Sequence, residues 1–476
     1  MSRRAAAGLV AGFLALGIVL VAPAPSGLSP AGWRTAGVGL LMAAWWVTEA
    51  IPIPATALVP LALFPVLGVA PIDRAAAPFA NPLIYLFLGG FLLAGAMQQA
   101  GLPRRLALVT VRLFGSRPGA LLAGMMAASA FLSMWVSNTA TALLMLPIGL
   151  SLVELVPGGG RDSGRSPFAR ALMLGIAYAC SVGGMGTLIG TPPNALLAGY
   201  ALEAFGRTIG FAEWMALGLP VVAVGLPLVH LVLTRVAFRL PRDPIAGGRA
   251  MLDRRIAELG PLRPAERRVG VVFALTAAAW IVRPLLETRL PGLSDAGIAI
   301  AAAIVLFLLP AADETGGRLL TWQQARGAPW GVLVLFGGGL SLAAAIGQTG
   351  LGDWLGGHMH GLADWPLPLL LLVVVAATIL LTELTSNTAT AATFLPVLGA
   401  LAVATGRDPL VLAAPAALAA SGAFMLPVAT PPNAIVYGSG SLDMADMVRA
   451  GLRLNVVFSL LLTTVGWLLV PVVLGP

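Results

Sequence analysis

The sequence is poor in charge, cysteine and histidine, and it contains no lysine. Charged residues make up 10% of its 476 positions, whereas soluble domains carry about 25%, so a large soluble domain is excluded. The single cysteine, Cys180, excludes an intramolecular disulfide and a cysteine metal cluster. Three histidines are too few and too scattered to indicate a metal site, and we expect His358 and His360 to lie in a solvated loop.

Apolar residues take the place of charge, making up 58% of the chain and giving a mean hydropathy of +0.92. Apolar runs of span length, or nearly so, recur from end to end, for example at 58–70, 83–98 and 456–474. Such runs predict a membrane protein with many spans. The 57 glycines and 37 prolines lie inside these runs, which is typical of closely packed and interrupted membrane helices.

The basic residues indicate topology. The net charge of +8 is set by 28 arginines, most of them in loops, and does not indicate a nucleic-acid partner. Arg3 and Arg4 precede an apolar run at 5–23, which could be a signal peptide. However, residues 22–25 make a poor cleavage site and further spans follow at once. We therefore expect a retained first span and a cytoplasmic N-terminus.

The pentapeptide Ser-Asn-Thr-Ala-Thr occurs twice, at 137–141 and 386–390, each time as a polar island in an apolar stretch. The two stretches, at about 119–156 and 367–403, could each cross a bilayer and return. Each could instead form a re-entrant hairpin of two half-depth helices that meet at the pentapeptide. Arginines on both sides of the first stretch favour the hairpin, because they place both of its ends on one side of the membrane. Non-helical backbone at that depth is tolerated only where it lines a polar site.

A second motif, Thr-Pro-Pro-Asn-Ala, follows each pentapeptide, at 191–195 and 430–434. Proline removes a backbone donor and disfavours a helical conformation in the residue before it. The motif therefore predicts two broken helices, at about 169–201 and 410–437, each made of two half-helices.

These motifs divide the chain into a first half at 1–240 and a second half at 270–476, joined by a basic cytoplasmic linker at 241–269. The loop before the second hairpin has no arginine, unlike the flanks of the first. We therefore expect the first hairpin to enter from the cytoplasm and the second from outside. The predicted fold class is an all-α integral membrane protein with an inverted-topology repeat.

The spacing of the motifs supports a duplication. Four pairs of matching motifs, among them Ser137 with Ser386, are each 249 residues apart. Thr191 and Thr430 are 239 apart, so the first half has ten extra residues, which we place in the loop 158–167.

The four islands can bind ions without charged side chains. A half-helix that begins inside the membrane points unpaired N–H groups and the positive end of its dipole at an anion. A half-helix that ends there exposes carbonyls that suit Na⁺, and Ser, Thr and Asn side chains can serve either ion. One such motif alone often only hydrogen-bonds a neighbouring helix. Two copies at one spacing indicate an anion site flanked by two cation sites, as in secondary transporters.

Three glutamates near spans are candidates for a functional role. Glu49 and Glu154 are expected mainly at interfacial positions, and Glu383, three residues before Ser386, is expected to support the second hairpin.

The stretches 133–141, 190–194, 382–388 and 429–433 resemble the divalent anion:sodium symporter family, the INDY-type di- and tricarboxylate transporters. The resemblance covers essentially the whole chain. It implies a homodimer with about eleven transmembrane helices and two re-entrant hairpins per protomer. A scaffold part would hold the dimer together, while a transport part slides in an elevator motion.

The resemblance also implies the residues of the site. Substrate carboxylates would be bound by Ser137, Asn138, Thr139, Thr191, Pro192, Ser386, Asn387, Thr388, Thr430 and Pro431. One Na⁺ site would use Ser133, Ser137, Asn138 and Gly190. The other would use Thr382, Thr385, Ser386, Asn387 and Ala429.

Together these patterns predict a sodium-coupled symporter of C4-dicarboxylates such as succinate, malate or fumarate, in the inner (plasma) membrane. A sodium-independent dicarboxylate exchanger and a transporter of sulfate or citrate are the alternatives. An enzyme is not expected, because the islands offer serine but no His, Lys or Asp. No cofactor is expected, and Na⁺ is the predicted coupling ion.

Overall fold

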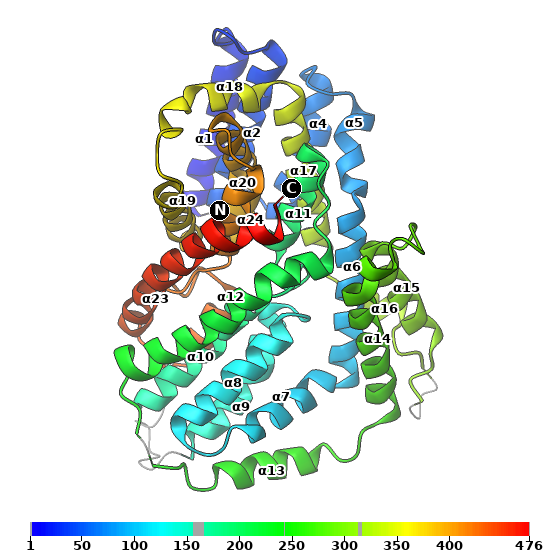
Figure 1. Cartoon of the computed structure of the whole chain (residues 1–476), viewed down its shortest axis with the longest axis vertical. Helices are drawn as coiled ribbons and strands as arrows, with labels where there is room; N and C mark the ends of the chain where they lie inside the picture. Colours follow the sequence, from blue (N-terminus) through cyan, green and yellow to red (C-terminus); the bar gives the residue numbers. More distant parts are fainter. Residues whose placement is uncertain (1, 156–165, 242, 313–316, 476) are drawn as a thin grey trace.

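The computed structural model describes residues 2–155, 166–241, 243–312 and 317–475, which form helices joined by turns (Figure 1). Within these residues the one β pairing is an isolated bridge between Pro310 and Arg318. The predicted all-α fold is therefore confirmed.

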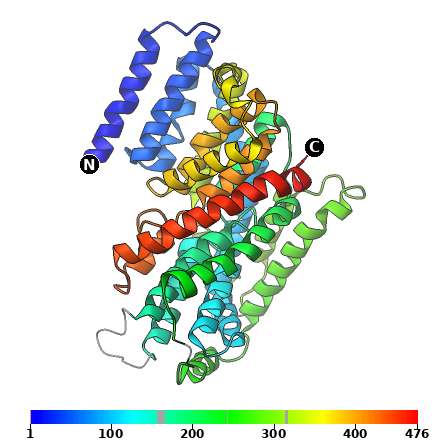
Figure 2. The ribbon, with the colours of Figure 1, turned by 60° about the vertical axis from the view of Figure 1, so that its left-hand side comes forward.

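The first half begins with two helices, α1 and α2, that pack against each other at the outside of the molecule. Figure 2 shows α1 at the outer edge of the molecule, packed beside α2. The elements up to the first hairpin are α1 (Arg3–Val21), α2 (Pro30–Thr48), α3 (Ile53–Thr56), α4 (Val59–Val66), α5 (Ile72–Ala76), η1 (Ala77–Ala80), α6 (Pro82–Ala100) and α7 (Leu102–Leu113). Those that follow are α8 (Pro118–Ser133), α9 (Asn138–Val153), α10 (Pro167–Gly184), α11 (Pro192–Phe205), α12 (Phe211–Leu231) and the π-helical turn η3 (Val232–Ala237).

The second half follows the same plan after a linking helix, α13. Its first elements are α13 (Gly248–Glu258), α14 (Pro264–Leu286), α15 (Asp295–Leu308), α16 (Trp322–Ala325), α17 (Trp330–Gln348), α18 (Leu351–His358) and η4 (His360–Leu362). They are followed by α19 (Leu367–Thr382), α20 (Asn387–Ala404), α21 (Pro409–Ala420), α22 (Pro431–Tyr437), α23 (Met444–Thr464), η5 (Val465–Leu469) and α24 (Val470–Val473).

Helix boundaries follow the local chemistry of the chain. Side chains of Ser29, Ser166 and Ser294 accept hydrogen bonds from the first turns of α2, α10 and α15. Proline occupies the first helical turn of many elements, where its missing N–H costs nothing. Capped, apolar helices of this kind keep their backbone groups paired within the membrane.

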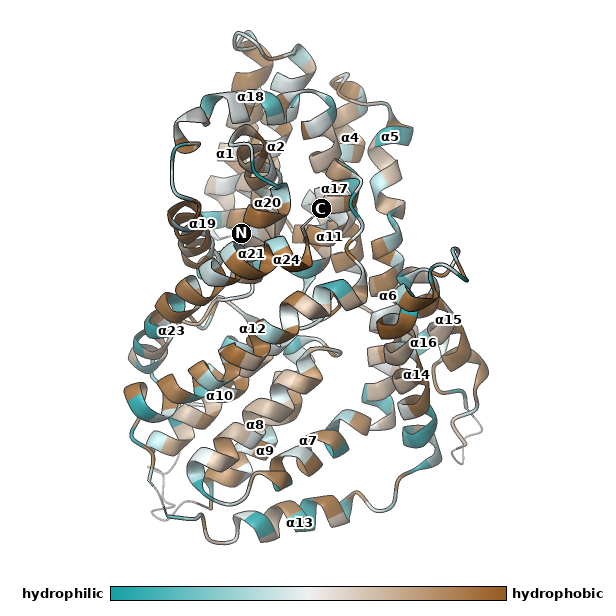
Figure 3. Ribbon diagram, viewed as in Figure 1, coloured by the Kyte–Doolittle hydropathy of each residue, from teal (hydrophilic) through white to brown (hydrophobic). Residues whose placement is uncertain are grey.

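Seven helical segments of the described residues are long and apolar enough to cross a membrane. They are 3–21, 72–100, 211–237, 264–286, 330–348, 387–404 and 444–473. Figure 3 shows the predominantly apolar character of these long helices. The multi-span class is thus confirmed, while the number of eleven spans stays a prediction.

One expected span differs from the structure. The apolar run at 58–70 does not form one helix of span length, because the chain here forms the short helices α3 and α4, which are interrupted at Ala57 and Leu58. Pro54, Pro60 and Pro65 divide this stretch and limit the length of each helix.

The duplication is visible in the helix boundaries. The hairpin arms α8 and α19 begin at 118 and 367 and end at 133 and 382, which are both 249 residues apart. The halves also pack reciprocally, because α9 contacts α22 while α20, its counterpart, contacts α11. Figure 1 shows α8 and α9 in the lower part of the molecule and α19 and α20 in the upper part.

The linker between the halves contains a surface helix. α13 lies along α7, and the guanidinium of Arg112 pairs with the carboxylate of Asp253 at 2.6 Å. The ten-residue insert of the first half falls mostly on 158–165, outside the described residues.

Candidate anion and cation site

The four polar islands meet at one cavity of about 1210 Å³. Its wall contains all ten residues predicted to bind substrate, together with Gly190, Thr385 and Ala429 from the predicted sodium sites. Ser133 and Thr382 do not line the cavity, because both side chains are fully buried behind the hairpin turns. The structure therefore gathers residues from stretches separated by about half of the sequence.

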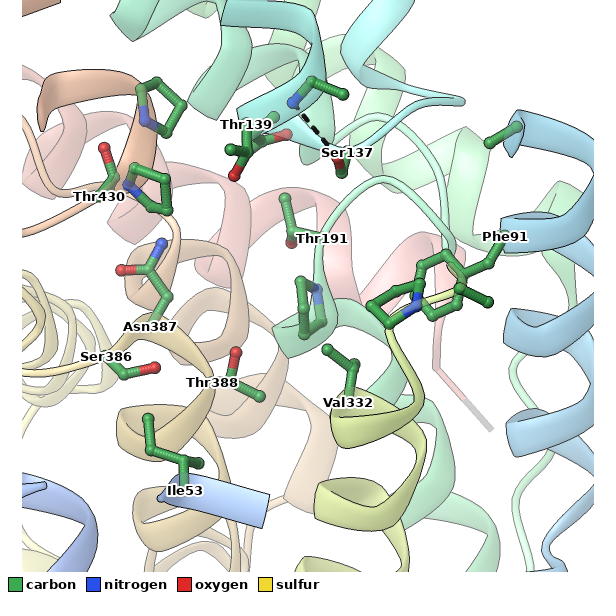
Figure 4. Close-up of a pocket in the computed structure, with 18 of the residues that line it drawn as sticks. Ile53, Phe91, Ser137, Thr139, Thr191, Val332, Ser386, Asn387, Thr388 and Thr430 are labelled. Atoms are coloured by element: carbon green, nitrogen blue, oxygen red, sulfur yellow. Dashed lines mark hydrogen bonds between the residues drawn. The ribbon is translucent and has the colours of Figure 1, made fainter. Parts of the chain in front are cut away.

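Figure 4 shows how the islands face one another. Thr139 from the first hairpin and Thr388 from the second lie on opposite sides of Thr191. On another side, Phe91 of α6 and Val332 of α17 add apolar side chains to the wall. The polar groups are thus concentrated where the hairpins and broken helices meet.

Helix N-termini converge on this cavity. The helices that begin at its wall are α9 at Asn138, α11 at Pro192, α20 at Asn387 and α22 at Pro431. The Ser137 hydroxyl accepts a hydrogen bond from Ala140 N at 3.3 Å, and the Thr430 hydroxyl accepts one from Asn433 N at 3.2 Å. α11 and α22 each begin with two prolines and so lack free N–H groups in their first turns. The free first-turn N–H groups of α9 and α20, and the positive ends of the helix dipoles, favour an anion in the cavity.

The asparagine of each hairpin is held by a buried hydroxyl five residues before it. The Ser133 hydroxyl donates to Asn138 Oδ1, and the Thr382 hydroxyl lies 2.8 Å from Asn387 Oδ1. Thr382 Oγ1 also lies 2.7 Å from the carbonyl oxygen of Ala420, where α21 ends. Each hairpin thus gathers uncharged oxygen atoms at one point, which is the ligand chemistry of a hard cation such as Na⁺.

Two glycines allow the first broken helix to approach Asn138. A Cβ atom at Gly184 would lie 3.0 Å from Asn138 Oδ1 and 3.1 Å from Gly190 O, and it would overlap the Thr191 methyl group. A Cβ atom at Gly190 would overlap the Gly184 carbonyl. Gly184 therefore lies against both Asn138 and Gly190, and it is a further residue at this place that the motifs do not indicate.

The residues of the predicted second sodium site differ in their surroundings. Ala429 lines the cavity beside the second hairpin. The Thr385 hydroxyl donates to Leu381 O at 2.9 Å and lies 2.6 Å from Thr390 Oγ1. It is therefore engaged inside the hairpin, whereas Thr382 lies directly against Asn387.

The asparagines of the two Thr-Pro-Pro-Asn motifs brace the broken helices. Asn194 and Asn433 are fully buried and do not line the cavity. Their Nδ2 groups donate to carbonyls of the unwound segments, at Gly184 (3.0 Å) and Thr187 (2.8 Å), and at Ala423 (3.2 Å) and Leu426 (3.0 Å). The two asparagines and the carbonyls that they bind are therefore equivalent in the two halves, and each equivalent pair is 239 residues apart.

Glu383 supports the second half, in keeping with the expectation from its position. Its buried carboxylate accepts hydrogen bonds from the backbone N–H groups of Phe424 (2.7 Å), Met425 (2.8 Å) and Leu426 (3.1 Å). It also accepts one from Asn455 Nδ2 at 2.9 Å. The carboxylate therefore ties the hairpin turn to the unwound segment between α21 and α22.

The cavity wall includes charged and amide side chains that the motifs did not indicate. Arg4 donates to Leu384 O at 2.9 Å and Val47 O at 2.5 Å, and so connects α1 and α2 to the second hairpin. Glu49, expected mainly at an interface, also lines the cavity. The amides in the wall are Gln98, Gln99 and Gln324. No local pattern near the N-terminus indicates that Arg4 reaches a hairpin 380 residues away.

The fold resembles that of solved membrane transporters. The YdaH transporter of Alcanivorax borkumensis is 18% identical, with all of both chains covered and a TM-score of 0.63. MtrF of Neisseria gonorrhoeae is 13% identical, with 98% of this chain and 94% of that chain covered and a TM-score of 0.57. At these identities the likeness shows the fold alone.

Relatives at much higher identity match over nearly the whole chain. A protein of Staphylococcus saprophyticus named "Sodium-dependent dicarboxylate transporter SdcS" is 43% identical over 98% of this chain and 92% of its own. Its namesake in Staphylococcus aureus is 40% identical with the same coverage. The model of the family described as "Sodium:sulfate symporter transmembrane region" matches residues 3–474. The chain therefore belongs to the sodium:sulfate symporter family, which confirms the resemblance to the divalent anion:sodium symporters.

Proposed function

We propose that this protein is a sodium-coupled symporter of C4-dicarboxylates such as succinate, malate and fumarate. Four helix N-termini converge on one cavity, next to two hydroxyl–asparagine pairs, and this arrangement is the main support for the proposal. The names of the staphylococcal relatives support the substrate and the coupling ion. Since the family and its relatives are transporters, no enzymatic activity is proposed.

The substrate would bind between the hairpins. Its two carboxylates would accept hydrogen bonds from hydroxyls, amides and first-turn N–H groups of the Ser, Asn and Thr residues among the ten already named, all of which line the cavity. Pro192 and Pro431 have no N–H group and would only pack against the substrate. One carboxylate would lie near Ser137, Asn138 and Thr139, and the other near Ser386, Asn387 and Thr388. A dicarboxylate suits this twofold arrangement, because each hairpin supplies the same donors.

Sodium would bind behind each hairpin turn. The first site would use Ser133, Ser137, Asn138 and Gly190. The second would use Thr382, Thr385, Ser386, Asn387 and Ala429. Because no arginine lies in the four islands, these cations would offset the charge of a bound dianion. Sodium and substrate would thereby favour each other's binding.

The orientation in the membrane is also proposed. With the N-terminus in the cytoplasm, the cavity would open to the cytoplasm, because its wall includes Ser2, Arg4 and the end of α6. The structure would then represent an inward-facing state of the plasma-membrane transporter. We further propose a homodimer in which the scaffold is fixed and the site moves in an elevator motion.

Labelled succinate uptake into proteoliposomes tests the proposal. We expect uptake with an inward Na⁺ gradient and little uptake when K⁺ replaces Na⁺, without any need for internal succinate. Uptake that ignores Na⁺ but requires preloaded dicarboxylate would make the protein an exchanger. Competition by sulfate or citrate, but not by malate or fumarate, would assign the alternative substrates.

Substitution of Gly184 by alanine tests the first sodium site. The added methyl group would lie 3.0 Å from Asn138 Oδ1 and would overlap Thr191. A polar contact to a charged group contributes about 1.5–3 kcal/mol, and loss of one such contact to Na⁺ should raise the Na⁺ concentration for half-maximal uptake about tenfold or more.

A matched variant separates this effect from a general one. Gly347→Ala introduces the same methyl group into α17, where nothing lies within 4 Å, and it should leave the Na⁺ dependence unchanged. An unaltered Na⁺ dependence in Gly184→Ala would exclude a cation next to Asn138.

A further inference from the structure

A second cavity, of about 280 Å³, lies apart from the transport site, where α10 begins, η3 ends and α23 begins. We call it the basic pocket. Its wall contains Arg170, Phe238, Arg239, Asp446, Arg449 and Arg453. Four arginines thus face one acidic side chain.

The acidic side chain is already paired. Arg170 Nη1 lies 3.1 Å from Asp446 Oδ1, and its guanidinium lies 5.5 Å from the centroid of the Phe238 ring. The other arginines, Arg239, Arg449 and Arg453, are exposed and have no ion pair to a described carboxylate. The basic pocket therefore offers three guanidinium groups without a partner among the described carboxylates, and the planar fork of each matches phosphate oxygens.

The basic pocket lies at the end of two candidate spans. One span ends at Ala237 and another begins at Met444, and both ends belong to or adjoin the pocket. Figure 1 shows these ends of α12 and α23 side by side, and the two elements are in contact. Residues at span ends lie at the level of lipid headgroups.

An exposed apolar stripe continues from the basic pocket along α23. At 3.6 residues per turn, Arg449, Arg453, Val456 and Leu460 fall on one face of this helix. Val456 is 55% exposed and Leu460 is 56% exposed, and neither is covered by another element. The neighbouring Leu452 is 50% exposed. Figure 3 shows the same change along α23, from hydrophilic at its start to hydrophobic beyond.

We infer that the basic pocket binds the headgroup of an anionic phospholipid. The phosphate would be held by Arg239, Arg449 and Arg453, and the acyl chains would follow Val456 and Leu460. Basic pockets between transmembrane helices are suited to such headgroups. A soluble phosphate would use the arginines alone, whereas a lipid would contact both the arginines and the adjoining apolar stripe.

Native mass spectrometry of the detergent-purified full-length protein tests this inference. The probes are phosphatidylglycerol, phosphatidylcholine as a zwitterionic lipid, and inorganic phosphate. We expect wild-type protein to retain phosphatidylglycerol in preference to phosphatidylcholine, and millimolar phosphate not to displace it. At about 1 kcal/mol for each basic residue, Arg449→Gln with Arg453→Gln should weaken retention about 25-fold.

A double variant of the surface helix α13 provides the control. Arg249→Gln with Arg254→Gln removes the same charge from exposed residues outside the basic pocket and should retain the lipid like wild type. Equal losses in both double variants would reduce the effect to net charge and overturn the site. Equal retention of the two lipids, or displacement by phosphate, would overturn it as well. Arg239→Gln, in another element, repeats the test should the α23 variant fold poorly.

Discussion

Replacement of both hairpin asparagines, Asn138→Ala with Asn387→Ala, is expected to abolish sodium-driven succinate uptake. Each amide oxygen is positioned by a buried hydroxyl, Ser133 or Thr382, at the start of a helix that points into the cavity. Each amide would contact both a sodium ion and a carboxylate. Loss of a hydrogen bond to a charged group costs about 1.5–3 kcal/mol, so each single substitution should lower uptake at a fixed Na⁺ concentration at least about tenfold.

The loss must be separated from misfolding. Gln348→Ala removes an amide of the same kind from the exposed end of α17, outside the cavity, and should transport like wild type. Thermal unfolding of each variant in detergent, followed by size-exclusion chromatography, reports whether it folds. Folded Asn138→Ala and Asn387→Ala protein with wild-type uptake would contradict the assignment of the site.

Glu383→Ala is expected to lower the stability of the fold far more than removal of an exposed carboxylate does. It would leave the buried N–H group of Phe424, the partly buried N–H groups of Met425 and Leu426, and the buried Asn455 amide without their acceptor. An unsatisfied buried donor costs about 1–3 kcal/mol, so a total of about 3 kcal/mol or more is expected. Glu383→Gln keeps one acceptor oxygen and should be intermediate.

Thermal unfolding of the purified protein measures this loss directly. Glu154→Ala is the control, because Glu154 is exposed at the end of α9 and carries no ion pair to a described residue. Its midpoint should stay within a degree or so of the wild-type value, since exposed side chains contribute little. A Glu383→Ala midpoint as high as that of Glu154→Ala would show that the carboxylate does not hold the unwound segment.

The positions where helices break could be predicted from local chemistry. Ser137 and Ser386 occupy the N-cap positions of α9 and α20, and Thr191 and Thr430 those of α11 and α22. Hydroxyl side chains favour that position and proline favours the residue after it, so the motifs determine where each half-helix begins. The constant spacing of 249 residues then identified the partners across the repeat.

The contacts that hold these breaks in place could not be predicted in the same way. Glu383 reaches backbone groups about 41 residues away, and Arg4 reaches Leu384 O, 380 residues along the chain. Such pairings depend on tertiary packing, and no periodicity or spacing encodes them. The two halves also differ here. In the first half Thr187 donates a hydrogen bond to Met134 O at 2.5 Å, whereas at the corresponding place in the second half Leu426 N donates to the Glu383 carboxylate. A repeat in sequence therefore does not predict identical support for its two copies.

We propose that the anion site is complete only when cations occupy both hairpin turns. Isothermal titration calorimetry of succinate into the purified protein, in NaCl and in KCl of equal ionic strength, tests it most directly. Coupling between binding sites commonly amounts to about 5–150-fold, and we predict succinate affinity at the upper end of that range, or lost altogether, when K⁺ replaces Na⁺. Equal succinate affinity in the two salts would contradict this coupling, because the hydroxyl–asparagine pairs would then have no part in it.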